Sequence, residues 1–171
     1  NEVTVSDAEG TETVTDAGGN MQVVVAKSTT YKFEVSYATA DPVVTVSEAP
    51  IYLRGGFTDW GASETNQLGF MAMDDANTAE ASHIYSLEVD YPGGASSFKI
   101  ADEGWGGTLG YNYGTAADDV QLELGVPLTL YSANSDESIG DSKNINVTLD
   151  AGTYIFAFED GVTKIMTVTS K

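Results

Sequence analysis

The two tryptophans of the chain, Trp60 and Trp105, have the residue type and the local setting that a sugar-binding surface needs. A pyranose ring presents a face of C–H groups and a rim of hydroxyls, and an indole offers the largest flat apolar surface on which such a ring can stack. Glycines, which carry no side chain to cover an indole, flank both residues: Gly61, Gly104, Gly106 and Gly107. The sequence therefore predicts two exposed aromatic platforms in turns. The alternative is that each indole caps one end of the fold, since large aromatic residues usually lie inside.

The residues needed for common catalytic and metal sites are scarce or poorly spaced. His83 is the only histidine and begins a predicted strand, and there is no cysteine, which argues against a Ser-His-Asp triad and against His- or Cys-based metal sites. Acidic segments at 74–75, 118–119 and 135–141 could bind calcium, but none has the spaced D-x-D-x-D-G pattern, and solvated loops explain them better. A glycosidase carboxylate pair would need a walled cleft, which a lone sandwich does not offer. We therefore expect no enzymatic activity, no cofactor and no metal.

The charge of the chain restricts its partners. The 171 residues include 26 acidic and 7 basic side chains, a formal net charge of −19. Nucleic-acid binding needs a positive stripe, and anionic membranes repel an acidic surface, so neither is expected as a partner. A neutral polysaccharide is unaffected by the field, although solubility alone would also explain the acidity. The first residues, NEVTVSDAEG, contain no basic or apolar leader region, so we expect a secreted protein whose signal peptide has been removed.

The residue pattern predicts β-structure almost throughout. Apolar and polar residues alternate in short segments that are separated by clusters of Gly, Asp, Asn and Ser, which is typical of an antiparallel sandwich. The segment from Met73 to Ser82 is interpreted as a loop insertion. The predicted strands are 3–6, 21–27, 30–37, 42–47, 50–54, 68–73, 83–90, 96–101, 120–124, 126–132, 144–149, 153–159 and 163–169.

An internal repeat predicts how the chain is organised. The segment that begins at Asn20 matches the one that begins at Asn144, with Tyr31 aligned to Tyr154 and Phe33 aligned to Phe156. Upstream, residues 3–5 match residues 128–130, and the offset falls only from 125 to 122 residues along the alignment. Convergence of similar hairpins is the alternative explanation. A true repeat predicts a partial sandwich at 1–47, equivalent to the last third of a module, followed by a complete module at 48–171.

In the partial copy, apolar side chains are expected to lack the strands that would bury them. Tyr31, Phe33 and Val35 should face a core if they are equivalent to residues of the complete copy. A few strands alone are marginal in water and leave an open edge. Residues 1–47 must then dock on residues 48–171 or on another chain, so self-assembly through this segment is a further expectation.

Four separated motifs stand out in the second module. They are IYLRGGFTDWG at 51–61, GASSFKIADEGW at 94–105, NYG at 112–114 and DAGTY at 150–154. Together they resemble motifs of the sandwich modules attached to bacterial pullulanases and amylases, although Thr58 stands where that family usually has Asn. The resemblance implies an α-glucan-binding module without catalytic activity.

The starch-binding domain of glucoamylase-type enzymes is similar more distantly. In that domain two tryptophans stack on sugar rings and a lysine bonds to hydroxyls. The resemblance implies that Trp60 and Trp105 are the platforms, that Lys99 bonds to sugar hydroxyls, and that Asn112 is a further hydroxyl partner.

These observations favour an all-β, immunoglobulin-like antiparallel β-sandwich preceded by a partial copy of the same sandwich. The function expected first is that of a secreted, non-catalytic module that binds α-glucan by tryptophan stacking. The second expectation is a structural repeat subunit of a secreted fibre or surface assembly, joined by strand addition. The two are not exclusive, and fold alone does not decide between them.

Overall fold

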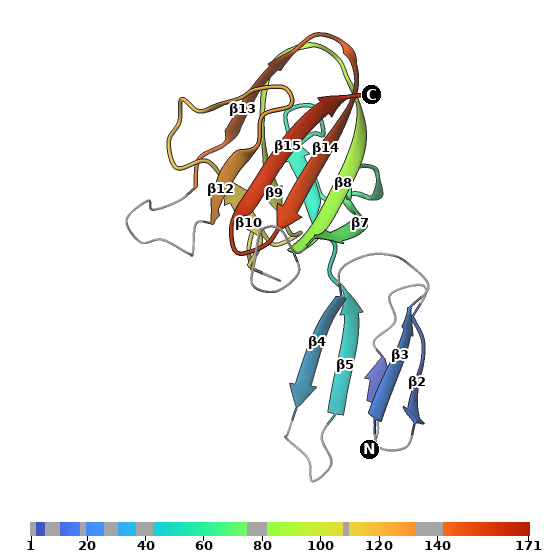
Figure 1. The fold of residues 1–171 in the computed structure, drawn as a ribbon. Coiled ribbons are helices and arrows are strands. Elements are labelled where there is room, and N and C mark those ends of the chain that lie inside the picture. The colour runs from blue at the N-terminus through green and yellow to red at the C-terminus, as the bar shows by residue number, and fades with distance from the viewer. Residues whose placement is uncertain are drawn as a thin grey trace. The chain divides into compact units, whose positions relative to one another are not determined.

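Strands dominate the computed structural model, which describes the backbone of residues 3–5, 11–17, 20–25, 31–36, 43–74, 82–107, 110–132 and 142–171 (Figure 1). The helical element among them is one short 3₁₀ turn, η1 (Glu64–Asn66). The chain divides into unit 1, Asn1–Pro50, and unit 2, Ile51–Lys171, so the division lies three residues after the expected boundary at 47. The described residues therefore have the all-β architecture that the sequence predicts.

Unit 2 is a sandwich of two mainly antiparallel layers. In the first layer, β9 (Gly94–Ala101) pairs with β6 (Tyr52–Gly55) on one edge, and with β13 (Ile145–Leu149) and β10 (Asn112–Gly114) on the other. The short strand β11 (Gln121–Leu122) runs parallel to β13, and the layers are joined where β10 pairs with β12 (Leu128–Ser132). The second layer has the order β12 (Leu128–Ser132), β15 (Lys164–Ser170), β14 (Gly152–Asp160), β8 (Ser82–Tyr91), β7 (Gly69–Asp74).

The core of unit 2 lies between these layers and follows from the period-2 pattern. Along β14, Tyr154, Phe156 and Phe158 are buried and alternate with less buried residues. From the facing layer, the ring of Phe98 meets that of Phe156 edge to face, with centroids 5.5 Å apart. Each fully buried aromatic side chain contributes roughly 1.5–3 kcal/mol, so this contact region is a main source of the stability of unit 2.

Each of the 13 predicted ranges overlaps an observed strand, and two strands were not predicted. The first is β2 (Thr11–Ala17), whose sequence TETVTDA has too few apolar residues to alternate. The second is β10, whose three residues are too few to show a period. In the expected loop insertion, Met73 and Asp74 instead end β7 and Ser82 begins β8, while residues 75–81 lie outside the described part.

Unit 1 contains a three-stranded sheet with the order β1 (Val3–Val5), β5 (Val43–Glu48), β4 (Tyr31–Ser36), and a separate pair formed by β2 and β3 (Asn20–Val25). The hairpin β4–β5 has the same register as β14–β15: Phe33 lies opposite Val46, as Phe156 lies opposite Val168. However, β1 runs parallel to β5, whereas β12 runs antiparallel to β15. Residues 3–5 and 128–130 are thus not equivalent in the fold, and the structural likeness is confined to the hairpin.

The expectation that the apolar face of β4 is buried is wrong for two of its three residues. Phe33 is 57% exposed and Val35 is 50% exposed, while Tyr31 is half-buried. Their counterparts Phe156 and Phe158 are 0% exposed. The difference follows from the neighbours. Phe156 packs against Phe98 of the facing layer and β14 lies between β15 and β8, whereas among the described strands β4 pairs with β5 alone.

A fragment of residues 51–171 should fold by itself, because the main hydrophobic cluster is drawn entirely from unit 2. We expect its melting temperature to lie within about 3 °C of that of the unit 2 transition in the full chain. Circular dichroism and calorimetry of both proteins provide the measurement. Loss of cooperative unfolding in the fragment would show that the core depends on unit 1.

Candidate functional site

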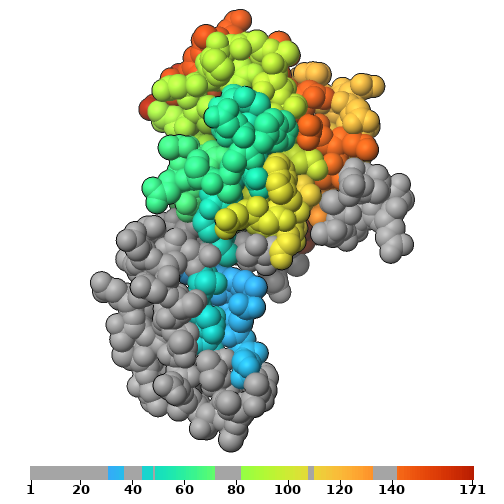
Figure 2. Space-filling view, turned by 180° about the vertical axis from the view of Figure 1, so that it is seen from behind, coloured from blue at the N-terminus to red at the C-terminus, as the bar shows by residue number. Residues whose placement is uncertain are grey.

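Trp60 and Trp105 lie next to each other at the surface of unit 2. Trp60 comes from the turn after β6 and Trp105 from the turn after β9, and their ring centroids are 6.3 Å apart with the planes inclined by 34°. Trp105 is 39% exposed and Trp60 is partly exposed, and neither belongs to the buried cluster. The two residues that the sequence singled out therefore form one aromatic surface, and Figure 2 shows the teal segment that follows β6 beside the yellow segment that follows β9.

Both tryptophans have strained backbones. Among the described residues, three non-glycine residues have a positive φ: Asp59 at 55°, Trp60 at 56° and Trp105 at 54°. The left-handed conformation costs an L-residue roughly 1–2 kcal/mol, and glycine would adopt it more cheaply. A bulky side chain in such a position points to a requirement for that side chain, since residues with strained backbones cluster at functional sites.

Arg54 on β6 joins the two tryptophan turns. Its Nε donates to the carbonyl of Trp60 at 2.8 Å, and its guanidinium carbon lies 3.6 Å from the centroid of the Trp105 ring. The other turn supplies two further acceptors, the carbonyls of Asp102 and Glu103, which Arg54 reaches at 3.0 and 3.1 Å. Arg54 is only 7% exposed. Burial lowers the pKa of its guanidinium, and the negative charges of Asp102 and Glu103 partly offset this because they raise the pKa.

Arg54 is a site residue that was not predicted from the sequence. Its signal was a lone cation directly after Leu53, in the middle of a short apolar strand. A buried Arg is rare unless it is paired, so that position alone already required several acceptors nearby.

Side-chain hydrogen bonds fix the turn that carries Trp60. The hydroxyl of Thr58 accepts from the Gly55 N–H at 2.8 Å and donates to the Leu53 carbonyl at 3.0 Å. The Trp60 N–H donates to the Gly55 carbonyl at 3.0 Å. From η1, the amide of Asn66 donates to the Leu53 carbonyl at 3.1 Å. Thr58, which departs from the family pattern, therefore stabilises the turn.

The turn that carries Trp105 is organised by Asp102 and Asn112. The carboxylate of Asp102 accepts from the Gly106 N–H at 2.7 Å, and its carbonyl accepts from the Trp105 N–H at 3.2 Å. From β10, the amide of Asn112 donates to the Trp105 carbonyl at 3.2 Å and accepts from the Lys99 ammonium at 3.1 Å. The structure thus brings Trp60, Lys99, Trp105 and Asn112 into one group.

Lys99 is held within this network. Besides Asn112, its ammonium donates to the hydroxyl of Ser142 at 3.1 Å, and that hydroxyl in turn donates to the Asn112 carbonyl at 3.0 Å. In this arrangement Lys99 orients Asn112, and through it the Trp105 turn. A contact between Lys99 and a ligand stays a prediction from the family resemblance.

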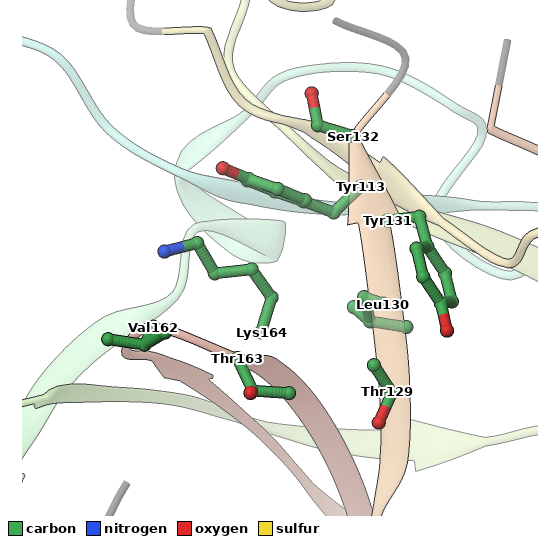
Figure 3. Close-up of a pocket in the computed structure, with 8 residues that line it drawn as sticks. All are labelled: Tyr113, Thr129, Leu130, Tyr131, Ser132, Val162, Thr163 and Lys164. Atoms are coloured by element: carbon green, nitrogen blue, oxygen red, sulfur yellow. The ribbon is translucent and has the colours of Figure 1, made fainter. Parts of the chain in front are cut away.

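A separate pocket of about 480 Å³ opens beside β12 and the β14–β15 turn (Figure 3). The Lys164 ammonium at its wall is paired with Asp160 at 2.8 Å, and Asp160 also accepts from the Tyr111 hydroxyl at 2.5 Å. Burial, and then this bond, raise the pKa of Tyr111. None of the four predicted site residues lines the pocket, which is formed by Tyr113, Thr129, Leu130, Tyr131, Ser132, Val162, Thr163 and Lys164.

In the described part of the chain, no group of three or more His, Asp or Glu side chains could hold a metal ion. Asp118 and Asp119 are exposed, whereas residues 75 and 135–141 lie outside the described residues. No helix among the described residues is long and apolar enough to cross a membrane.

Comparisons with protein-family models, curated proteins and solved structures found no match to this chain. The likeness to α-glucan-binding modules therefore rests on the sequence motifs quoted above.

Trp105→Gly should be more stable than Trp105→Ala by about 1 kcal/mol, because glycine tolerates the left-handed backbone at this position. Both variants lose the same indole, so the comparison isolates the backbone strain. Urea unfolding of the two proteins provides the measurement. An alanine variant that equals or exceeds the glycine variant in stability would show that the turn is not strained.

Arg54→Met should lower the free energy of unfolding of unit 2 by about 3 kcal/mol, because it removes the hydrogen bonds to three carbonyls and the contact with Trp105. Arg54→Lys should recover only part of the loss, since an ammonium lacks the planar fork. Lys171→Met is the control, because it removes an exposed ion pair with Glu88 and should change stability by less than about 1 kcal/mol. Equal effects of Arg54→Met and Lys171→Met would contradict this role for Arg54.

Proposed function

We propose that this chain contains a non-catalytic module that binds neutral α-glucan chains by stacking sugar rings on Trp60 and Trp105. One observation carries the proposal: the only two tryptophans of the chain lie side by side at the surface, each with a left-handed backbone. Bulky residues with a strained, left-handed backbone cluster at functional sites, so this conformation supports a functional role for the pair beside the contact that Trp105 makes with Arg54.

The geometry of the two rings favours a curved ligand. Two indoles whose planes are inclined by 34° would suit consecutive sugar rings that turn relative to each other. An α-1,4-linked glucan coils in this way, whereas a β-1,4-linked glucan forms a flat ribbon. The inclined pair therefore supports a starch-type chain over a cellulose-type chain.

Polar groups beside the rings could contact sugar hydroxyls. Asn112 borders Trp105, and Glu103 and Asp59 are exposed neighbours of the tryptophans in their turns. Amide and carboxylate oxygens accept hydrogen bonds from hydroxyls, and Lys99 fixes the direction of Asn112. A few aimed polar groups around an aromatic surface are typical of sites for neutral, polar ligands.

The surface charge is compatible with such a ligand. A net charge of −19 repels anions but leaves a neutral polysaccharide unaffected. We place the protein outside the cell as part of the same proposal, where it would meet polysaccharide.

Assembly with other chains is the second candidate function. The observation that favours it is the exposure of Phe33 and Val35 on β4, the last described strand of its sheet. A large apolar residue that is half or more exposed on an edge strand favours pairing with another chain.

Titration with a soluble maltooligosaccharide should quench tryptophan fluorescence, because both tryptophans of the chain lie in the proposed site. We expect a dissociation constant on the order of 10⁻⁵ to 10⁻³ M, unchanged between low and high salt because the ligand is neutral. By calorimetry, Trp105→Ala should abolish binding with the fold intact, whereas Lys99→Ala should only weaken it. Tyr131→Ala is the control, since it removes an exposed aromatic residue of the separate pocket and should leave the affinity unchanged.

Two results would contradict this proposal. Binding that survives the loss of both Trp60 and Trp105 would remove the site from the tryptophan turns. Binding lost in Tyr131→Ala but retained in Trp105→Ala would place the ligand in the pocket beside β12 instead.

A further inference from the structure

The strand β4 ends the three-stranded sheet of unit 1. Among the described strands it pairs only with β5, and no other described strand lies along its second edge (Figure 1). The equivalent strand of unit 2, β14, has the same hairpin register but is paired on both edges, with β15 and with β8. A hairpin of this type thus accepts an antiparallel strand on the edge that β4 leaves open.

One face of β4 continues the apolar surface of β5 as far as that edge. Val44 and Val46 of β5 are 6% and 0% exposed, and Val35 and Phe33 lie directly opposite them on the same face of the sheet. Phe33 is nevertheless 57% exposed and Val35 50% exposed. Burial of apolar area is favourable by about 25 cal/mol per Å², so a strand that covered these two side chains would be stabilised.

The sequence of β4, YKFEVS, is complementary to itself when two copies run antiparallel. If Phe33 lies opposite Phe33 of a second copy, then Lys32 lies opposite Glu34 of that copy, and Glu34 opposite Lys32. Tyr31 and Val35 are matched in the same way on the apolar face. Cross-strand pairs of opposite charge and of apolar residues are the pairs that stabilise a sheet.

The charges on the other face are already arranged for this pairing. Lys32 and Glu34 of one strand form an ion pair of 2.9 Å, and their partners on β5 are the uncharged residues Ser47 and Thr45. A second copy would turn the single pair into an alternating group of four charges without any like-charge contact between strands. Repulsion between the two acidic chains acts over a longer range and is screened beyond about 8 Å at physiological salt.

The backbone also permits this register. In an antiparallel ladder, alternate residues of an edge strand point their N–H and C=O groups outward. In the proposed pairing Lys32 lies opposite Glu34 of the second copy, and Phe33 lies opposite Phe33. The numbers of two paired residues therefore always differ by zero or by an even number. Residues whose backbone groups point outward on one copy thus face residues whose backbone groups also point outward on the other copy.

We propose that two copies of this chain associate through their β4 strands, antiparallel and centred on Phe33, to form a twofold-symmetric dimer. Each copy uses its open edge, so the pairing closes and does not continue into a fibre. The dimer does not depend on the proposed glucan site.

The register can be tested by disulfide trapping, because the chain has no cysteine of its own. In a Phe33→Cys variant the two introduced thiols would lie directly opposite, with Cα atoms about 5 Å apart, within reach of a disulfide. The matched control is Val35→Cys, which is exposed on the same face of the same strand. Its two thiols would lie about 14 Å apart, because each faces position 31 of the other copy. We expect Phe33→Cys to form covalent dimers at least about tenfold faster under mild oxidation.

Charge reversal gives a second, independent measurement by analytical ultracentrifugation from about 10 µM to about 1 mM, where small interfaces dissociate. Lys32→Glu and Glu34→Lys should each raise the dissociation constant of the dimer at least about tenfold, since both place like charges across the strands. The double variant should dimerise like the original chain, and an equimolar mixture of the two single variants should form heterodimers. Asp119→Lys, at an exposed site in unit 2, changes the charge by the same amount as Glu34→Lys; it is the control for that variant and should not weaken dimerisation.

Three outcomes would overturn the proposal. The first is a chain that stays monomeric over the whole concentration range. The second is equal trapping of Phe33→Cys and Val35→Cys, which would mean random collision. The third is that the single charge reversals weaken dimerisation, but neither the double variant nor the mixture of single variants restores it. That result would mean that β4 pairs with a strand other than β4.

Discussion

The candidate site depends on the buried guanidinium of Arg54. This one group hydrogen-bonds to the Trp60 carbonyl, reaches two carbonyls of the Trp105 turn and stacks on the Trp105 ring. A planar fork with several donors and a flat face can do all of this at once, whereas an ammonium cannot. The carbonyls gain partners, and the buried charge of Arg54 gains acceptors. The two turns are thereby held together, although 44 residues separate the tryptophans in the sequence.

The surrounding hydrogen bonds offset the backbone strain at both tryptophans. Thr58 ties the first turn to β6, and Asp102 and Asn112 tie the second turn to β9 and β10. The left-handed conformations persist because these contacts over-determine them. For a weakly bound sugar this matters, since a surface that is already ordered loses little conformational entropy when the ligand binds. Rigid turns at the strand ends of the sandwich are thus well suited to bind a neutral ligand on a shallow surface.

The sequence predicted most strands of this fold because burial on two-layered sheets leaves a period-2 pattern, as in Tyr154, Phe156 and Phe158. It did not predict β2, which lacks that pattern, or the central position of Arg54, whose partners are backbone carbonyls that no side-chain motif reveals. The two hairpins show the limit most clearly. Phe33 and Phe156 have the same register and similar neighbours in sequence, yet one is exposed and the other buried. Pairing register is local information, whereas burial depends on distant parts of the chain, here β8 alongside β14 and the facing layer that carries Phe98.

The central claim, that Trp60 and Trp105 together bind α-glucan, can be tested most directly through their indole N–H groups. A ¹⁵N-labelled chain gives one indole cross-peak for each of its two tryptophans, which makes the assignment simple. During titration with a maltooligosaccharide, both peaks should shift with a single dissociation constant, and a cello-oligosaccharide of the same length should shift them far less. Indole peaks that stay in place at millimolar maltooligosaccharide, or that respond equally to both sugars, would contradict the account.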